Sequence, residues 1–189
     1  MGSRDFEEKP CNCNTSARDR SGQCIYDSRC RQTMVVYKAT CRVCQMFYIG
    51  CTQQQIKKRM QQHFNSAGEW VNLKKQSDSF ASHFGSHFVG ANSINIHGRA
   101  KANDFRKILK MEILWKGNPI SCVRGFGRLS CSLCMNERLA ILNSFKNNPD
   151  KLINSCNEFY GACRHKPGFH GFFNITPCTD ERLRKRVQQ

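Results

Sequence analysis

The sequence predicts an α+β fold with a small, mostly antiparallel sheet of three strands flanked by helices. Two short runs rich in β-branched and aromatic residues, MVVYKA at 34–39 and QMFYIG at 45–50, lie close together near the start. Runs of this composition are typical of strands, and their proximity favours an antiparallel hairpin. Helical patterns, one further apolar run and more helical patterns follow, an order that suggests a small α+β domain.

A helix is predicted directly after the second strand. The Thr-x-x-Gln pattern starting at Thr52 has the spacing of a capping box, and QQQIKKRMQQHF follows without a helix breaker. Ile56 and Met60 lie four residues apart, so both would face the core of the domain. Arg59 and His63 have the same spacing and would share a neighbouring stripe of the helix surface.

The later segments complete the predicted domain. SFASHFGSHF at 79–88 reads as a short helix, 91–104 as a polar loop and 105–117 as the third strand. Helical spacing of apolar residues predicts a helix over 131–145, and NNPD then marks a turn and a new helix start. A last helix is expected over 151–163.

Composition divides the chain into three parts and shows no internal repeat. Residues 1–33 form a cysteine-bearing leader, which could be a zinc module. The main domain covers 34–165, and a basic tail covers 166–189. The basic run at 182–186 fits a nuclear-import signal or a phosphate-contacting arm, although short runs of this kind are frequently only solvated chain ends.

The net charge indicates a polyanionic partner. Thirty Lys and Arg residues against fourteen Asp and Glu leave a formal charge of +16, which favours nucleic acid over a generally basic solvated surface. No stretch approaches the run of about 18 apolar residues that a membrane span needs. The charged N-terminus, MGSRDFEEKP, does not read as a signal sequence. We therefore expect a protein that works inside the cell, away from membranes.

Thirteen cysteines require an explanation. They would suit a disulfide framework in an extracellular chain, but the sequence lacks a visible signal and contains two Cys-x-x-Cys pairs with histidines nearby. Zinc sites built from thiolates are therefore favoured over disulfides. A cysteine nucleophile is not expected, because no other feature argues for thiol catalysis.

Several motifs resemble the GIY-YIG nuclease signature: Tyr37, the run Tyr48-Ile49-Gly50, Thr52, Arg59 and His63. The first element departs from the family pattern, since Val35-Val36-Tyr37 stands where the family has Gly-Ile-Tyr. Further ordered blocks, namely KILKMEILWKGNPIS, LSCSLCMNERLAIL and LINSCNEFYGACRH, are similar to the endonuclease domain of Penelope-like retroelements. The resemblance covers roughly residues 10–165 and implies the GIY-YIG nuclease fold.

The resemblance implies a catalytic site for phosphodiester hydrolysis. Glu137 occupies the place of the glutamate that holds a single divalent metal, Mg²⁺ or Mn²⁺. Tyr37 would act as general base or orient the attacking water, and Tyr48 would hydrogen-bond the water or the scissile phosphate. Arg59 would clamp the phosphate, and His63 would orient a tyrosine or touch the phosphate.

Asn154 matches the asparagine that holds such a site together by hydrogen bonds. Structural alternatives exist for each of these residues: tyrosines that pack in the core, a surface arginine, a core histidine, a solvated carboxylate and a helix-face amide. The residues alone do not choose between these alternatives and the catalytic interpretation.

The resemblance also implies a structural zinc site on Cys41, Cys44, His83 and His87. Cys-x2-Cys and His-x3-His are both spacings that place two donors on one Zn²⁺. Such a site would staple the hairpin between the two tyrosine elements to a distant helix. The alternative is a turn with two reduced cysteines and two unrelated histidines.

The remaining cysteines suggest two further sites with less certain ligands. One would use Cys11, Cys13, Cys24 and Cys30 in the leader; the other would use Cys131, Cys134, Cys163 and His165 beside Glu137. Ligands could also be exchanged between these groups. Ordinary thiols are expected at Cys51, Cys122, Cys156 and Cys178.

These interpretations together predict a nuclear, metal-dependent endonuclease that nicks double-stranded DNA and exposes a 3′ hydroxyl for target-primed reverse transcription. A reverse transcriptase in the same polyprotein or complex would be its partner, because the chain itself carries no reverse-transcriptase motif. Two other functions remain open: a catalytically silent, zinc-stabilised DNA-binding module, and a repair or junction-cleaving nuclease on the same scaffold.

Overall fold

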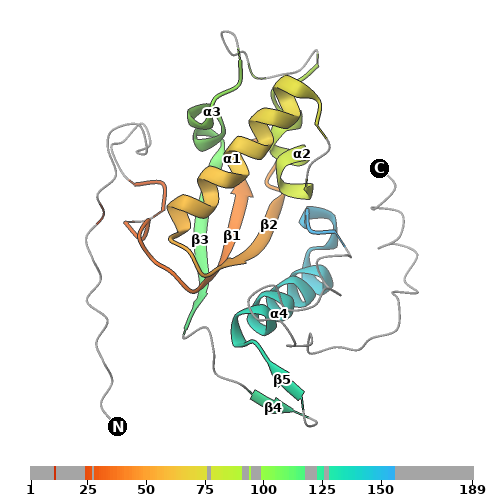
Figure 1. Cartoon of the computed structure of the whole chain (residues 1–189). Helices are drawn as coiled ribbons and strands as arrows, with labels where there is room; N and C mark the ends of the chain where they lie inside the picture. The colour runs from red at the N-terminus through yellow and green to blue at the C-terminus, as the bar shows by residue number, and fades with distance from the viewer. Residues whose placement is uncertain are drawn as a thin grey trace.

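The computed structural model describes most of the main domain and part of the leader (Figure 1). The described residues are 11, 24–26, 28–75, 78–90, 94, 99–117, 123–125 and 128–155, with the backbone alone for 123–125 and 128–130. The basic tail and most of the predicted helix at 151–163 lie outside the described residues.

A three-stranded antiparallel sheet forms the centre of the fold, which confirms the predicted α+β class. Its strands are β1 (Val35–Cys41), β2 (Phe47–Thr52) and β3 (Leu109–Lys116), in the order β2-β1-β3. Strands β1 and β2 form the predicted hairpin. A separate pair of short strands, β4 (Val123–Gly125) and β5 (Arg128–Ser130), was not predicted from the sequence.

Helices cover both faces of the sheet. Helices α1 (Ile56–Leu73), α2 (Ser79–Ser86) and α3 (Ala102–Lys107) lie on one side, and α1 crosses the sheet in Figure 1. Helix α4 (Ser132–Asn147) packs on the other side, mainly against β2.

Alternation along β1 assigns its side chains to these two faces. Val35, Tyr37 and Ala39 join the hydrophobic cluster beneath α1 and α2, whereas Val36 belongs to the cluster beneath α4. Successive side chains of a strand point to opposite faces of the sheet, so a central strand covered on both sides must be apolar almost throughout.

Helix α1 begins later than the capping-box pattern predicts. Thr52 still belongs to β2, and its Oγ1 accepts a hydrogen bond from the Gln54 N–H at 3.0 Å. The helix starts at Ile56, and no side chain caps it. The carbonyls of Gln32 and Cys30 accept hydrogen bonds from the first two helical N–H groups, at 2.9 and 3.1 Å. Backbone carbonyls from the leader therefore do what the predicted cap would have done.

The buried face of α1 agrees with its pattern, since Ile56 and Met60 are both buried. The predicted helices at 79–88 and 131–145 correspond to α2 and α4. The first part of the predicted strand at 105–117 is wrong, because residues up to Lys107 form α3. Asp104 stabilises the start of α3 by accepting a hydrogen bond from the Lys101 N–H at 3.0 Å, which allows Phe105 to be buried.

The helix predicted from residue 151 is also wrong over the described residues. A short 3₁₀ helix, η2 (Pro149–Lys151), ends there, and Leu152 then pairs in parallel with Phe47. The Ile153 N–H donates to the Phe47 carbonyl at 2.8 Å. Strand β2 is at the edge of the sheet, so its outer backbone groups need partners, and the chain stays extended to provide them.

Gly50 allows the two tyrosines of the hairpin to pack closely. A Cβ at this position would lie 2.6 Å from the Tyr37 hydroxyl oxygen and 2.8 Å from the Tyr48 ring. Both neighbours are buried aromatic side chains with little room to move. The close approach therefore requires glycine.

We predict that Gly50→Ala lowers the free energy of unfolding by about 1–3 kcal/mol, because it overpacks the core. Gly68→Ala is the matched control: a Cβ at that position in α1 meets nothing closer than 3.5 Å. The control should be neutral or stabilising by up to about 1 kcal/mol, since alanine favours the helix. Chemical denaturation of both variants measures the effects, and equal stability of the two would contradict the packing argument.

Candidate active site and metal centres

One surface pocket brings together three of the predicted catalytic residues. Its volume is about 220 Å³, and Tyr48, Arg59 and Glu137 all line it. They come from β2, α1 and α4, elements that are distant in sequence and lie on different layers of the fold. Cys51, Cys134 and several uncharged polar side chains complete the lining, and Glu137 is the one carboxylate among these lining residues.

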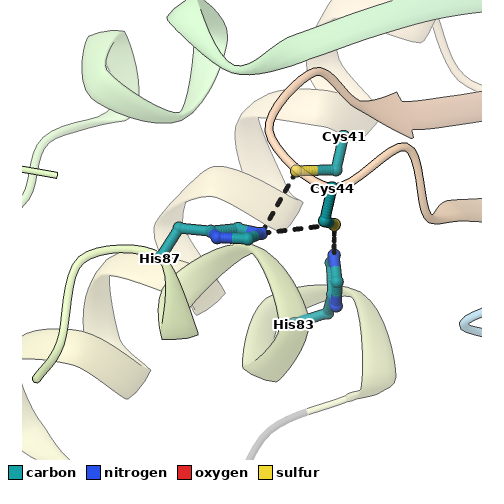
Figure 2. Close-up of side chains that lie close together, drawn as sticks. All are labelled: Cys41, Cys44, His83 and His87. Atoms are coloured by element: carbon teal, nitrogen blue, oxygen red, sulfur yellow. Dashed lines mark hydrogen bonds between the residues drawn. The ribbon is translucent and has the colours of Figure 1, made fainter. Parts of the chain in front are cut away.

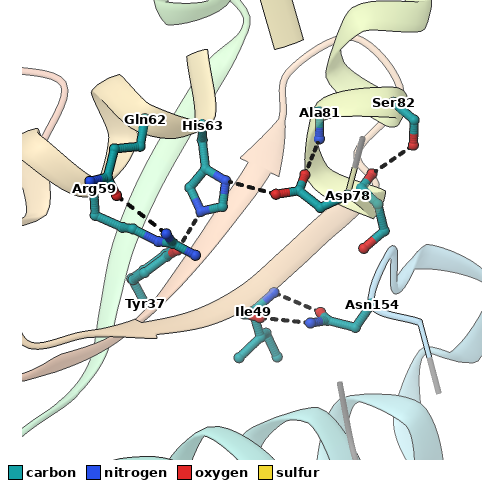
Figure 3. Close-up of polar contacts among 10 residues, drawn as sticks. Tyr37, Ile49, Arg59, Gln62, His63, Asp78, Ala81, Ser82 and Asn154 are labelled. Carbon is teal, nitrogen blue, oxygen red and sulfur yellow. Dashed lines mark hydrogen bonds and ion pairs between the residues drawn. The ribbon is translucent and has the colours of Figure 1, made fainter. Parts of the chain in front are cut away.

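Tyr37, His63 and Asp78 form a polar chain beside this pocket (Figure 3). Tyr37 is fully buried, and its hydroxyl oxygen lies 2.9 Å from His63 Nε2. His63 Nδ1 lies 3.6 Å from the Asp78 carboxylate. The Ala81 N–H donates to the other oxygen of Asp78 at 2.7 Å, so Asp78 also caps helix α2.

The electrostatics define the direction of the hydrogen bonds in this chain. Burial, together with the nearby charge of Arg59, lowers the pKa of His63, although Asp78 works in the opposite direction. A neutral imidazole has one donor and one acceptor nitrogen. With Nδ1–H directed at the carboxylate, Nε2 is the acceptor of the Tyr37 O–H. Burial would raise the pKa of Asp78, but hydrogen bonds from His63 and Ala81 outweigh it and keep the carboxyl ionised.

Tyr37 is a neutral phenol in this environment. Burial raises its pKa above the ordinary value, and the neighbouring Arg59 opposes that rise only in part. The general-base role expected of Tyr37 therefore requires somewhere for the phenolic proton to go, and His63 Nε2 is within hydrogen-bond distance.

Asp78 is the residue of this group that sequence reasoning missed. The aspartate directly before the predicted helix at 79–88 was a recognisable cap signal. Its contact with His63, however, joins two different helices, and no local pattern could have indicated it.

Arg59 lines the pocket, and its guanidinium lies beside the Tyr37 side chain (Figure 3). It also hydrogen-bonds the Tyr37 hydroxyl. One terminal nitrogen of its guanidinium donates to Gln62 Oε1 at 3.3 Å. Its Nε is buried and has no hydrogen-bond partner among the residues the structure describes. An unsatisfied buried donor of a cationic group is costly unless a ligand completes it.

Cys51 and Cys134 lie next to Glu137 in the pocket. The hydrogen bond between the two thiols, burial and the charge of Glu137 all raise the pKa of Cys51 well above its ordinary value. Cys51 is therefore a protonated thiol, which does not suit a nucleophile. Cys131 and Cys134 are both buried at the start of α4, while the other two ligands suggested with them, Cys163 and His165, lie outside the described residues.

Asn154 fastens the chain after α4 to the backbone of β2. Its side-chain amide donates to the Ile49 carbonyl at 2.7 Å and accepts from the Ile49 N–H at 2.8 Å (Figure 3). Ile49 lies between Tyr48 and Gly50, so these two hydrogen bonds hold the strand segment that presents Tyr48 to the pocket.

Cys41, Cys44, His83 and His87 form a separate cluster, and one ligand atom from each lies within 4.8 Å of the others (Figure 2). Cys41 is the last residue of β1 and Cys44 lies in the turn that follows, while the histidines come from α2 and its C-cap. Cys41 Sγ lies 3.2 Å from His87 Nε2, and Cys44 Sγ lies 3.3 Å from His83 Nε2.

This donor set could hold a metal such as zinc. Burial and the neighbouring His87 lower the pKa of His83 to about 4, so the imidazole is neutral and ready to coordinate. Burial raises the pKa of Cys41 to about 11, so its thiolate form depends on a nearby cation. Two thiolates and two neutral imidazoles form a common structural zinc site.

The leader contributes a second group, in which the sulfur atoms of Cys11, Cys24 and Cys30 converge. Cys13, the fourth ligand suggested from the sequence, lies outside the described residues.

Comparisons with protein-family models, with curated proteins and with solved structures find no match. Among the helices that the structure describes, none combines the length and apolar character needed to cross a membrane.

We predict that Cys44→Ser removes one zinc ion per chain and lowers the Tm by roughly 5 °C or more, because the site ties the β1–β2 turn to α2. Cys44 is exposed, so the substitution leaves no cavity. The control is Val43→Ser, at an exposed residue of the same turn that is not one of the four ligands, which should keep the wild-type zinc content. Elemental analysis and thermal melts test this; unchanged zinc and Tm in Cys44→Ser would refute a zinc site there.

Proposed function

We propose that this chain is a metal-dependent DNA endonuclease of the GIY-YIG type, which nicks target DNA and exposes a 3′ hydroxyl. One observation carries the proposal: Tyr48, Arg59 and Glu137 converge on a single pocket, with the Tyr37–His63–Asp78 chain beside it. Phosphodiester hydrolysis needs a phosphate clamp, a metal ligand and a route for the proton of the attacking water, and these residues supply one of each.

Arg59 is suited to binding the scissile phosphate. Its Nε has no hydrogen-bond partner among the described residues. The rest of the guanidinium is held by Gln62, at 3.3 Å, and by the Tyr37 hydroxyl. The guanidinium fork matches two phosphate oxygens, a geometry that lysine cannot provide. The overall charge of +16 would bring the DNA backbone to such a clamp through phosphate contacts.

Glu137 would hold the catalytic Mg²⁺ or Mn²⁺. It is the one carboxylate among the residues that line the pocket, and Mg²⁺ sites often use only one or two carboxylates together with substrate phosphate. The bound metal would stabilise charge on the phosphoryl oxygens. Without a cation between them, the Glu137 carboxylate would repel the phosphate of bound DNA.

Tyr37 and His63 would move the proton. As Tyr37 accepts a proton from the attacking water, its own phenolic proton passes to His63 Nε2, and the imidazolium that forms is stabilised by the Asp78 carboxylate. This pathway replaces a free phenolate, which the burial of Tyr37 disfavours. Tyr37 is fully buried and hydrogen-bonded to Arg59, so the attacking water would reach its hydroxyl only when Arg59 moves to a bound phosphate.

The resemblance to Penelope-like retroelements supplies the biological setting of the proposal. Nicking in the nucleus would give a 3′ end from which a partner reverse transcriptase primes. A silent DNA-binding module would gain nothing from Glu137 in the pocket, and a junction-cleaving enzyme would differ in substrate preference. These alternatives are outcomes of the following test.

We predict that Glu137→Gln and Tyr37→Phe each lower metal-dependent plasmid nicking by about 10²–10⁴-fold, since each removes a group needed in the transition state. Glu69→Gln, an exposed α1 carboxylate paired with Lys75, is the control and should cleave like wild type. DNA binding should persist in all three variants.

Unimpaired nicking by Glu137→Gln would refute the metal role of that residue. If the zinc-replete wild type binds DNA but does not cleave it with Mg²⁺ or Mn²⁺, the protein is a binding module. Preference for branched over linear DNA would identify a junction nuclease.

We predict that Asp78→Asn lowers the plateau of kcat/KM by about 10–10³-fold while keeping the fold, because asparagine caps helices about as well as aspartate. The amide NH₂ would favour the His63 tautomer that protonates Nε2, which leaves the Tyr37 proton without an acceptor. Asp104→Asn, which replaces the capping aspartate of α3, is the matched control.

The pH profile distinguishes this role from a structural one. Cleavage requires neutral His63, so activity should fall as the pH drops through the lowered pKa of this residue, below about 6.5. Asp78 raises the pKa of His63 whereas Arg59 lowers it, so removing the carboxylate should move the acid limb to lower pH. An unchanged acid limb would contradict the pathway.

A further inference from the structure

We propose that Cys11, Cys24 and Cys30 form a second zinc site, which fastens the leader to the start of helix α1. Their sulfur atoms all lie within 4.8 Å of one another, and the Cys30 and Cys11 sulfurs are 3.4 Å apart. Zn–S bonds of about 2.3 Å in a tetrahedral site place sulfurs about 3.8 Å apart. The observed cluster is therefore close to the size that one zinc ion requires.

A disulfide does not account for the cluster. None of the three cysteines is in a disulfide, and a bond between any two would still leave the third sulfur within 4.8 Å of them. Simple packing of reduced thiols also explains the convergence of the three sulfurs poorly. The three positions are separated by 13 and 6 residues, and only Cys30 is fully buried, so hydrophobic burial alone would not bring them together. Convergence of three sulfurs from separate parts of a segment is the arrangement that thiolate ligation of zinc produces.

The surroundings suit the charge and coordination of such a site. Three thiolates around Zn²⁺ carry a net charge of −1, and Arg29 and Arg42 line the pocket of about 560 Å³ that Cys24 also lines. The same pocket gives water access to the site for a fourth ligand. Ile25 and Tyr26, both buried, anchor the chain between the ligands.

The site would act on α1 through the backbone. The Cys30 carbonyl accepts a hydrogen bond from the Lys57 N–H at 3.1 Å, and the Gln32 carbonyl accepts one from the Ile56 N–H at 2.9 Å. No side chain caps this helix, so these carbonyls satisfy its first N–H groups. A metal that holds Cys30 in place would therefore hold the first turn of the helix that carries Arg59 and His63.

This site is separate from the Cys41, Cys44, His83 and His87 cluster, because it joins the leader to α1 rather than the hairpin turn to α2. It goes beyond the proposed endonuclease activity and does not depend on it. Its test uses no cleavage assay, so failure of one proposal is distinguishable from failure of the other.

The test is the zinc content of the purified full-length chain. Cys24→Ser should contain one zinc ion fewer than the wild type, Val43→Ser should match the wild type, and Cys24→Ser combined with Cys44→Ser should lose two. An unchanged zinc content in Cys24→Ser would overturn the proposal. Mass analysis of the non-reduced wild type showing a disulfide among the three cysteines would overturn it as well.

Hydrogen exchange measures the predicted effect on α1. The amides of Ile56 and Lys57 should exchange at least about tenfold faster in Cys24→Ser than in the wild type, and Cys44→Ser should leave them unchanged. Equal protection in Cys24→Ser would refute the bracing role.

If Cys24→Ser does not fold, cobalt-substituted Cys11→Ser replaces it, because Cys11 is only half-buried. Its thiolate-to-cobalt absorption should be lower than that of the wild type by one of the three leader ligands. Absorption equal to that of the wild type would overturn the proposal.

Discussion

Burial of β1 on both faces is the constraint on which the rest of the structure depends. The strand pairs with β2 on one edge and β3 on the other, and its side chains alternate between two hydrophobic clusters. A slip of one residue would exchange the faces and turn Tyr37 away from His63. The two ladders prevent this slip, so the position of the tyrosine hydroxyl follows from sheet register.

A fully buried hydroxyl on such a strand needs a hydrogen-bond partner, and this need explains the arrangement around Tyr37. His63 satisfies the hydroxyl and is itself satisfied by Asp78, whose side chain is 44% exposed. Within this group of three side chains, the two buried members, Tyr37 and His63, are therefore neutral. The formal negative charge lies on Asp78, which is the solvated member. This order limits the cost of desolvation, and it is also the order in which a proton could leave the interior.

Sequence patterns predicted the local features and missed those that depend on distant partners. Runs rich in β-branched and aromatic residues identified the two hairpin strands, and the spacing of Ile56 and Met60 identified the buried face of α1, because each signal lies within one element. The Cys-x2-Cys and His-x3-His pairs are also local patterns. That the two pairs would come together in one cluster was implied only by the family resemblance. The start of α1 was misplaced because its cap comes from Cys30 and Gln32, far from the helix in sequence. The chain is extended at Asn154 because backbone groups of edge strand β2 require hydrogen-bond partners there. The intrinsic propensities of residues 151–155 do not indicate this requirement.

The backbone cap on α1 bears on how modular this domain is. Residues 34–155 contain the sheet, all the helices and every residue of the candidate active site among those the structure describes, so they resemble a portable unit. The first two N–H groups of α1 nevertheless depend on carbonyls at residues 30 and 32. A recombination event that joined residue 34 to a new upstream partner would separate the helix from its own cap. The segment that could be transferred between proteins with its fold intact therefore begins within the leader, upstream of the first strand.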